Sequence, residues 1–361
     1  MKKNSYILEA QNFLKNNPDI KSFDIVMHDC NGIGRGKIIR RNELIKIYKS
    51  GRQFPLSLMG MDITGEDVPE TGLIFNQGDG DIKAWPIPSS LKPIHKSKPA
   101  RGELFMNMHD IKGNKLSTDP RNQLEKKIGE FKKKGISFRA AFELEFFLVS
   151  NELDEYGKLK PAKSVIGKKS SRRKTDVYSV DILHGMLPLF DDIYEATVLA
   201  NIEAETIISE YAPGQYELTL KHQNSILKAA DDILRLKRII RAQARLHGVT
   251  ACFMAKPMED VSGSGMHFHI SLYNKKNKNL FAEKNKKKIS KYLSYALGGL
   301  SKTMGESMLI FAPNANSWRR FIKGSYAPIS PNWGIDNRSV AFRIPSSDVQ
   351  NTRIEHRVSG V

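Results

Sequence analysis

The chain has 361 residues, of which 40% are hydrophobic and only two are cysteines. This length predicts two domains, or one large domain with insertions, with enough apolar side chains for a sizeable core. No apolar run reaches the roughly 18 residues of a membrane helix, and Cys30 and Cys252 match neither a zinc motif nor a disulfide framework, so we expect a cytoplasmic protein with no membrane partner.

Net charge is +18, from 57 Lys and Arg against 39 Asp and Glu, and a charge of this sign suits nucleic acid. The basic residues, however, stand in short separate runs without interleaved aromatic residues, at 132–134, 168–174, 275–278 and 284–288. We interpret them as solvated surface charge and expect no specific nucleic-acid partner. Salt-titrated binding of DNA or RNA tests the alternative.

Residues 1–105 are typical of a small β-rich domain, and their N-terminus lacks the apolar core of a signal peptide. The turn-like residues 30–36 contain Gly32, Gly34 and Gly36, which could belong to a phosphate loop. The pattern leads into a strand, so we favour a hairpin. The expected elements are helices at 5–16 and 41–50 and strands at 22–29, 37–40, 58–65 and 81–88.

Residues 106–361 mix helices with strands, which predicts an α+β fold with antiparallel strands. Asp119 is the expected cap of a helix that has Pro120 in its first turn and stops at Gly135. The other expected elements are strands at 137–150, 201–209, 250–257, 265–273, 340–345 and 352–358, helices at 180–198, 224–247 and 289–308, and a polar insertion at 151–175.

The stretch FELEFF places two carboxylates where a strand favours apolar residues. Glu143 and Glu145 are two residues apart, so a strand points both to one face. The flanking phenylalanines imply burial, and two buried carboxylates repel each other unless something neutralises them. A divalent cation does this, whereas an edge strand with a solvated Glu pair is the alternative.

Two further stretches carry acidic and imidazole groups. Glu210 and Glu217 bracket a Pro-Gly turn, which can return both carboxylates towards one point. His267 and His269 share one strand face, after a Gly-Ser-Gly segment that lets backbone approach a ligand closely. Paired histidines here suit either a ligand site or a structural role.

The last third of the chain adds guanidinium groups. Arg320, Arg338 and Arg343 are forked donors suited to carboxylate and phosphate. In the final strand, His356 takes one face, and the opposite face receives Arg353, Glu355 and Arg357. Carboxylate-rich ligation favours Mg²⁺ or Mn²⁺ over zinc, and two such cations among arginines suit ATP and phosphoryl transfer.

Taken in order, ELE, APGQYE, GSGMHFHISL, NRSVAFRIP and RIEHR resemble the motifs of the glutamine synthetase family over nearly the whole chain. The resemblance implies a β-grasp-like N-terminal domain at 1–105 and a catalytic α/β domain with a curved antiparallel sheet at 106–361. It also implies two Mg²⁺ or Mn²⁺ ions, one held by Glu145, Glu210 and Glu217, and the other by Glu143, His267 and Glu355.

The same resemblance implies further roles. Arg338 and Arg343 would stabilise the transferring phosphoryl group. Family members form two stacked hexameric rings, in which a neighbour's Asp completes each active site; Asp62 and Asp81 are the nearest matches here. The expected ATP contacts are Glu205, His269, Ser271 and Arg353, and the expected substrate contacts are Gly263, Arg320, Arg357 and Tyr326.

The implied reaction joins the γ-carboxylate of glutamate to an amine through γ-glutamyl phosphate, with ATP as co-substrate. Tyr326 stands where glutamine synthetases carry a Glu that binds ammonium, and Ser262 replaces an Asn of the glutamate loop. With MDITGEDVPETG at 61–72, these departures resemble the branch that uses organic amines such as putrescine. We therefore favour a γ-glutamyl-polyamine ligase of nitrogen metabolism, with ammonia as the alternative amine.

A third hypothesis keeps the fold without the catalysis. The sequence ends six residues after Glu355, whereas family members continue through several more helices, so the C-terminal part of the family pattern is expected to be missing. A silent assembly or regulatory subunit would follow from such truncation. Every expected metal ligand is nevertheless present, which favours an active enzyme.

Overall fold

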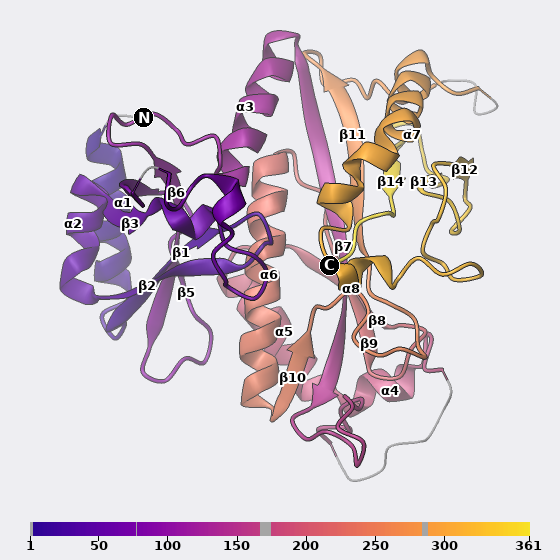
Figure 1. Cartoon of the computed structure of the whole chain (residues 1–361), viewed down its shortest axis with the longest axis horizontal. Helices are drawn as coiled ribbons and strands as arrows, with labels where there is room; N and C mark the ends of the chain where they lie inside the picture. Colours follow the sequence, from indigo (N-terminus) through magenta and orange to yellow (C-terminus); the bar gives the residue numbers. More distant parts are fainter. Residues whose placement is uncertain (1–2, 77, 167–174, 284–287) are drawn as a thin grey trace. The chain divides into compact units, whose positions relative to one another are not determined.

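The computed structural model of the chain describes residues 3–76, 78–166, 175–283 and 288–361. The chain divides into two compact units, residues 1–130 and 131–361, each with its own sheet and helices (Figure 1). The predicted α+β class is confirmed. The basic run at 168–174, and most of the run at 284–288, lie outside the described residues.

A six-stranded sheet forms the centre of the first unit, in the order β2-β1-β6-β4-β3 with β5 paired to β6. Its strands are β1 (Ser22–His28), β2 (Gly34–Arg40), β3 (Arg52–Pro55), β4 (Asp81–Pro86), β5 (Lys92–Pro93) and β6 (Arg101–His109). The helices are α1 (Lys3–Asn16) and α2 (Leu44–Ser50), with 3₁₀ turns at Arg41–Glu43, Leu56–Met59 and Pro69–Thr71. Ala10 and Ile47 from the helices join Phe23 and Ile25 of the sheet in one apolar core, which holds the two layers together.

The glycine-rich turn joins β1 to β2 as an antiparallel hairpin, as predicted. Gly32 has a φ of +70°, a conformation that favours glycine. A Cβ at Gly36 would collide with the carbonyl oxygen of Ile25 on the neighbouring strand. A strand follows the turn where a phosphate loop needs a helix N-terminus, so that alternative is wrong.

Two expectations for the first unit differ from the structure. The strand expected at 58–65 is wrong, because Oδ1 of Asp62 accepts hydrogen bonds from the backbone N–H groups of Thr64, Gly65 and Glu66 and closes a turn. Strand β6 was not predicted, although it pairs with β1, β4 and β5. The domain boundary expected at 105–106 lies inside β6.

An eight-stranded sheet forms the centre of the second unit, in the order β12-β13-β14-β11-β7-β9-β8, with β10 paired to β7. The strands are β7 (Ile136–Ser150), β8 (Ala204–Ser209), β9 (Gln215–Leu220), β10 (Val249–Cys252), β11 (Met266–Asn274), β12 (Trp333–Ile335), β13 (Phe342–Ile344) and β14 (Ile354–His356). Within this sheet β12 and β13 are parallel, and the other neighbours are antiparallel. Since β7 pairs with β9, β10 and β11, it organises the sheet.

Helices cover this sheet and bury its apolar side chains. Leu189 of α5 and Leu236 of α6 pack with Leu144 and Phe146 of β7, whereas Leu297 of α7 packs against β13 and β14. The helices of the second unit are α4 (Val180–Gly185), α5 (Leu187–Leu199), α6 (Ile226–Leu246), α7 (Lys291–Phe311) and α8 (Ala315–Trp318), and α3 (Pro120–Lys133) spans the boundary between the two units. Among the described residues, none of the helices has the length and apolar character needed to cross a membrane.

Capping residues, glycine and proline explain several of these helix boundaries. Asp119 precedes α3 and accepts the N–H of Arg121 at 2.9 Å, as expected of a cap. Gly248 follows α6 with a φ of +72°. The single helix expected at 180–198 is wrong. The first helix ends before Met186, which is the N-cap of a second helix that has Pro188 in its first turn.

Candidate functional site

Strand register brings the acidic and imidazole side chains of the second unit together. Directly opposite residues on neighbouring strands share a face of the sheet. The side chains at 143 and 145 also share a face, because they are two residues apart on β7. The opposed pairs are Glu143 with His267, Glu145 with Glu217, and His269 with Glu355.

We call the group formed by Glu143, Glu145, Glu210, Glu217, Glu355, His267 and His269 the acidic cluster. Glu143 lies at its centre, with Oε2 at 3.0 Å from Nδ1 of His267 and Oε1 at 2.9 Å from Nε2 of His269. Nδ1 of His267 is also 3.8 Å from a carboxylate oxygen of Glu217 and of Glu355. Glu355 is fully buried. The alternative of an edge strand with solvated carboxylates is therefore wrong.

The cluster holds more negative charge than its own cations neutralise. Burial and the neighbouring Glu210 raise the pKa of Glu145 to about 7. Burial, followed by repulsion from Glu143 and Glu145, raises the pKa of Glu217 well above its usual range, and burial raises that of Glu210 as well. These three carboxyls therefore resist ionisation in the protein alone.

The other two carboxylates of the cluster, Glu143 and Glu355, have imidazole or guanidinium partners that lower their pKa. Burial alone would raise the pKa of Glu143, but hydrogen bonds from His267 and His269 outweigh it and hold the pKa far below its usual range. Burial likewise opposes ionisation of Glu355, but Arg357 and the two imidazoles lower its pKa. Ionisation is thus least favourable on the side of the cluster formed by Glu145, Glu210 and Glu217, which is where a cation from outside the chain would have the largest effect.

The donor set of the acidic cluster fits a divalent cation. Ligand atoms lie within 4.8 Å of one another in three triads: Glu145 with Glu210 and Glu217, Glu143 with Glu217 and His267, and Glu143 with His269 and Glu355. Carboxylate oxygens with a minority of imidazole nitrogens suit Mg²⁺ or Mn²⁺. The structure thus brings together all six residues expected as metal ligands and adds His269 to them.

A cavity of about 300 Å³ adjoins the cluster. Its lining includes Glu143 and all four residues expected to contact ATP, namely Glu205, His269, Ser271 and Arg353. Nε of Arg353 donates to Nδ1 of His269 at 3.1 Å, and the Ser271 hydroxyl donates to the carbonyl of Thr352 at 3.0 Å. One concave surface therefore joins the expected nucleotide contacts to the acidic cluster.

The same cavity is lined by residues that the motifs did not indicate. Arg139 lies over the ring of Tyr273, with its guanidinium carbon 4.0 Å from the ring centroid, and it donates to the Tyr273 hydroxyl at 3.2 Å. The two-residue period of the strands continues to these positions, because 139 precedes Glu143 by four residues and 273 follows His269 by four. Extending that period along each strand would have found them.

The predicted arginines occupy different environments. Arg343 donates to Oε2 of Glu355 at 2.8 Å, and Arg357 donates to its Oε1. Buried Arg320 donates to the carbonyl oxygen of Val358 at 2.8 Å, and burial lowers the pKa of Arg320 to about 10. Arg338 is exposed between β12 and β13.

Two other substrate candidates lie in loops of the second unit. A Cβ at Gly263 would come within 2.4 Å of the carbonyl oxygen of Ala255 and within 2.6 Å of Cγ of Arg320, so glycine is required there. Tyr326 lies in the loop after α8 and is 66% exposed. Asp62 and Asp81 belong to the first unit, where Asp62 is half-buried, and the exposed Asp81 accepts a hydrogen bond from Gln53 at 3.1 Å.

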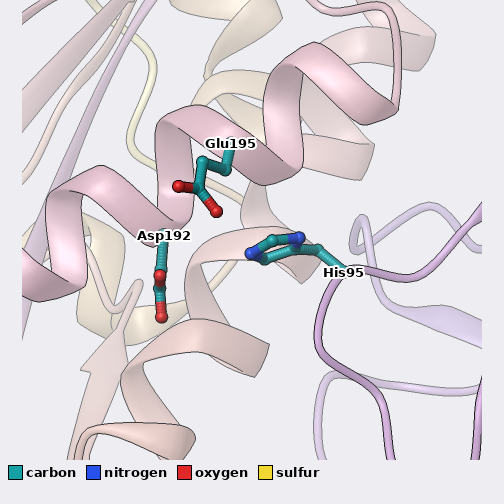
Figure 2. Close-up of side chains that lie close together, drawn as sticks. All are labelled: His95, Asp192 and Glu195. Atoms are coloured by element: carbon teal, nitrogen blue, oxygen red, sulfur yellow. The ribbon is translucent and has the colours of Figure 1, made fainter.

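Helix α5 carries another acidic pair, Asp192 and Glu195, one turn apart (Figure 2). Asp192 is buried, and its Oδ2 lies 2.9 Å from Nε2 of His247, which follows α6. This contact joins α5 to the C-terminal end of α6. The carboxylate of Asp192 therefore has a partner, His247, that explains why it can be buried.

Known proteins resemble this chain in sequence and in fold. Residues 117–361 match the family model described as glutamine synthetase, catalytic domain. Gamma-glutamylputrescine synthetase PuuA of Escherichia coli (strain K12) is 37% identical over 356 residues, which cover 99% of this chain and 75% of that protein. Glutamate–isopropylamine ligase of Pseudomonas sp. is 30% identical over 364 residues, covering 98% and 76%.

The fold is shared with solved structures as well. The cryo-electron microscopy structure of Plasmodium falciparum glutamine synthetase matches 100% of this chain and 71% of its own, with a TM-score of 0.82 at 21% identity. At this level of identity the likeness establishes the fold.

Proposed function

Since the chain belongs to the glutamine synthetase family and is therefore an ATP-dependent carboxylate–amine ligase, we propose that it joins the γ-carboxylate of glutamate to an organic amine such as putrescine. The observation that carries this proposal is the acidic cluster beside a cavity lined by Glu205, His269, Ser271 and Arg353. A ligase of this type needs its cation and its nucleotide side by side.

The choice of amine depends on Tyr326 and on the relatives. An exposed phenol at this position offers no carboxylate to a small ammonium ion, but it leaves room and apolar surface for a larger amine. The names of two relatives, a gamma-glutamylputrescine synthetase and a glutamate–isopropylamine ligase, support the same class of substrate.

Each group then has a role in the proposed reaction. Two Mg²⁺ or Mn²⁺ ions, held by the six predicted ligands, would neutralise the cluster and the phosphates of ATP. Arg320 and Arg357 would bind the carboxylates of glutamate, and Arg338 and Arg343 would stabilise charge on the transferring phosphoryl group. The γ-phosphorus bonds to the γ-carboxylate as its bond to ADP breaks; the amine then bonds to the acyl carbon, loses a proton, and phosphate leaves.

The proposal extends to the assembly and its location. We expect a cytoplasmic homo-oligomer of stacked hexameric rings, in which Asp62 or Asp81 of one subunit reaches the active site of its neighbour. The mass of the particle by light scattering checks this expectation. A monomer with full activity would contradict the shared active site.

An ADP-release assay with glutamate and Mg²⁺ or Mn²⁺, run over ammonium, putrescine, longer polyamines and monoamines, tests the amine. We expect turnover with putrescine or a related amine to exceed that with ammonium, and EDTA to abolish it. Turnover with ammonium alone would reject the organic amine. Metal-dependent stabilisation by an ATP analogue without turnover on any amine would instead indicate a silent family member.

A pair of variants tests the role of position 326. Tyr326→Glu is expected to shift the preference towards ammonium, because it supplies a carboxylate for a small cation. Tyr156→Glu is the matched control, since Tyr156 is 76% exposed and lies in the connection that follows β7, outside the motifs. An equal shift in both variants would show that surface charge, and not position 326, decides the preference.

A further inference from the structure

Gln215 is a buried amide at the start of β9 whose hydrogen-bonding capacity is fully used. It is 1% exposed. Its Oε1 accepts from the backbone N–H of Ala212 at 3.3 Å and from the Ser262 hydroxyl at 2.8 Å. Its Nε2 donates to Oε2 of Glu145 at 3.2 Å and to the carbonyl oxygen of Gly263 at 3.1 Å.

The orientation of this amide follows from its partners. The Ala212 N–H group can only donate, and the Gly263 carbonyl can only accept. The amide oxygen must therefore face Ala212 and the amide nitrogen must face Gly263. A carboxylate at Glu145 accepts from that same nitrogen, so the side chain joins the acidic cluster to the loop at 262–265.

Gln215 also determines which oxygen of Glu145 faces the cluster. Oε2 accepts from Gln215 and, at 2.7 Å, from the backbone N–H of Gly265. Oε1 lies 3.7 Å from Nε2 of His267 and points into the cluster. Two donors on one oxygen hold the carboxylate against rotation and leave the other oxygen free to bind a cation.

We propose that Gln215 is a positioning residue that orients Glu145 towards the cation and fixes the loop at 262–265 that carries Gly263, so that metal binding and acid-substrate binding depend on one amide. This rests on the proposed function for the identity of the acid. Outer partners of metal ligands typically contribute 10- to 100-fold to metal affinity or activity. Ser262 assists, because its hydroxyl occupies a lone pair of the Gln215 oxygen.

The variant Gln215→Met keeps most of the side-chain volume and removes every hydrogen bond of the amide, including a longer one from Nε2 to the Ser264 hydroxyl at 3.4 Å. We expect its dissociation constant for Mn²⁺, measured by calorimetry without substrates, to rise about 10-fold. The KM for glutamate should rise as well, while the KM for ATP stays within 2-fold. Gln243→Met is the matched control, because Gln243 is also 1% exposed but lies on α6; it should change thermal stability alone.

Ser262→Ala provides a milder variant that folds even where Gln215→Met does not. It removes one hydrogen bond to Oε1 and leaves the Nε2 contacts, so we expect a rise of about 3-fold in the KM for glutamate. Values within experimental error of wild type for Mn²⁺ and glutamate in Gln215→Met overturn the proposal. If that variant does not fold, an unchanged KM for glutamate in Ser262→Ala overturns it.

The metal titration separates this proposal from the proposed function. Wild-type protein that binds Mn²⁺ but turns over no amine would reject the proposed reaction, and the Mn²⁺ constants of Gln215→Met would still test the role of Gln215. Equal loss of Mn²⁺ affinity in Gln243→Met would show a general effect of buried substitutions. That result would overturn the positioning role of Gln215 and leave the proposed function standing.

Discussion

Asp119 in the first unit and Glu217 in the second are both buried carboxylates, but their neighbours are opposite in kind. Asp119 accepts hydrogen bonds from the backbone N–H groups of Met108, Arg121 and Asn122. Glu217 instead lies opposite Glu145. Burial raises the pKa of both carboxyls, but the backbone N–H donors oppose that rise at Asp119, whereas repulsion from Glu143 and Glu145 adds to it at Glu217. A buried acid surrounded by donors stabilises the fold, whereas a buried acid surrounded by acids requires a cation from outside the chain.

Replacing Glu217 by Gln should give the largest effect and should separate stability from activity. Removing the charge relieves repulsion, so the metal-free variant is expected to melt at a higher temperature than wild type at pH 8. Metal-dependent ADP release should fall at least about 100-fold, because a lost ligand costs no less than a lost outer partner. Thermal melting in EDTA measures the change in stability, and the ADP-release assay measures the change in turnover. Lower stability together with unchanged turnover would show that Glu217, like Asp119, only stabilises the fold.

Replacing Asp119 by Ala should have the opposite pattern. The variant loses a helix cap and leaves the buried N–H of Met108 without its acceptor, which together cost about 3 kcal/mol of folding free energy. Turnover per folded molecule is expected to stay within about 2-fold of wild type. Urea unfolding and turnover below the melting transition measure the two quantities. A large fall in kcat would give Asp119 a role in the reaction.

The pH dependence of stability should show that Glu145, like Glu217, is a buried acid that resists ionisation. Its folded pKa is raised from the ordinary 4.5 to about 7, so the stability that its protonation contributes is fully present below 4.5 and is lost as pH rises through about 7. Glu145→Gln stays neutral, so in EDTA its free energy of unfolding should rise relative to that of wild type by about 3 kcal/mol over that window. Wild-type Mn²⁺ binding should tighten over the same window, because the metal displaces the proton.

Parallel denaturation curves of the two proteins from pH 5 to 8.5, with a Mn²⁺ titration at each pH, measure these changes. Curves that keep a constant separation at every pH would show that Glu145 titrates in its ordinary range.

His356 offers the smallest expected effect. It lies on the face of β14 opposite Glu355, with its ring 4.4 Å from Phe311 and 5.2 Å from Phe342, and burial lowers its pKa to about 4. Its contribution to stability is therefore present above pH 6.5 and is lost as pH falls towards 4. His356→Leu should keep turnover within about 2-fold and resist acid better, as melting at pH 5 and 7 will measure.

The sequence predicted the site better than it predicted the first sheet, for a physical reason. Charged residues at two-residue spacing inside apolar strands, as at Glu143 and Glu145, are rare enough to mark both strand and face. The stretch 58–65 has strand-like composition, but the Asp62 carboxylate bonds to its own backbone and turns it. Strand β6 follows a Lys- and Pro-rich stretch that conceals its start, so local pattern alone missed it.

Two further features, the role of Gln215 and the strand β9, were not predicted from the sequence. Gln215 is an ordinary polar residue in sequence, and it becomes a bridge only because Ser262 and Gly263 approach it from 47 and 48 residues away. Pairing of this range is invisible to periodicity within a window. The sequence analysis also did not predict strand β9, which carries Gln215, because a Pro-Gly turn directly before it made the stretch look like a loop.

Strand β7 constrains how the length of this chain can vary among descendants. It pairs with β9, β10 and β11 at once, and its side chains alternate between the apolar core and the acidic cluster. Inserting or deleting one residue within 141–147 would exchange the two faces against every partner strand. A single-residue insertion or deletion in β7 would therefore disrupt the apolar core and the acidic cluster together, whereas a substitution alters one side chain on one face.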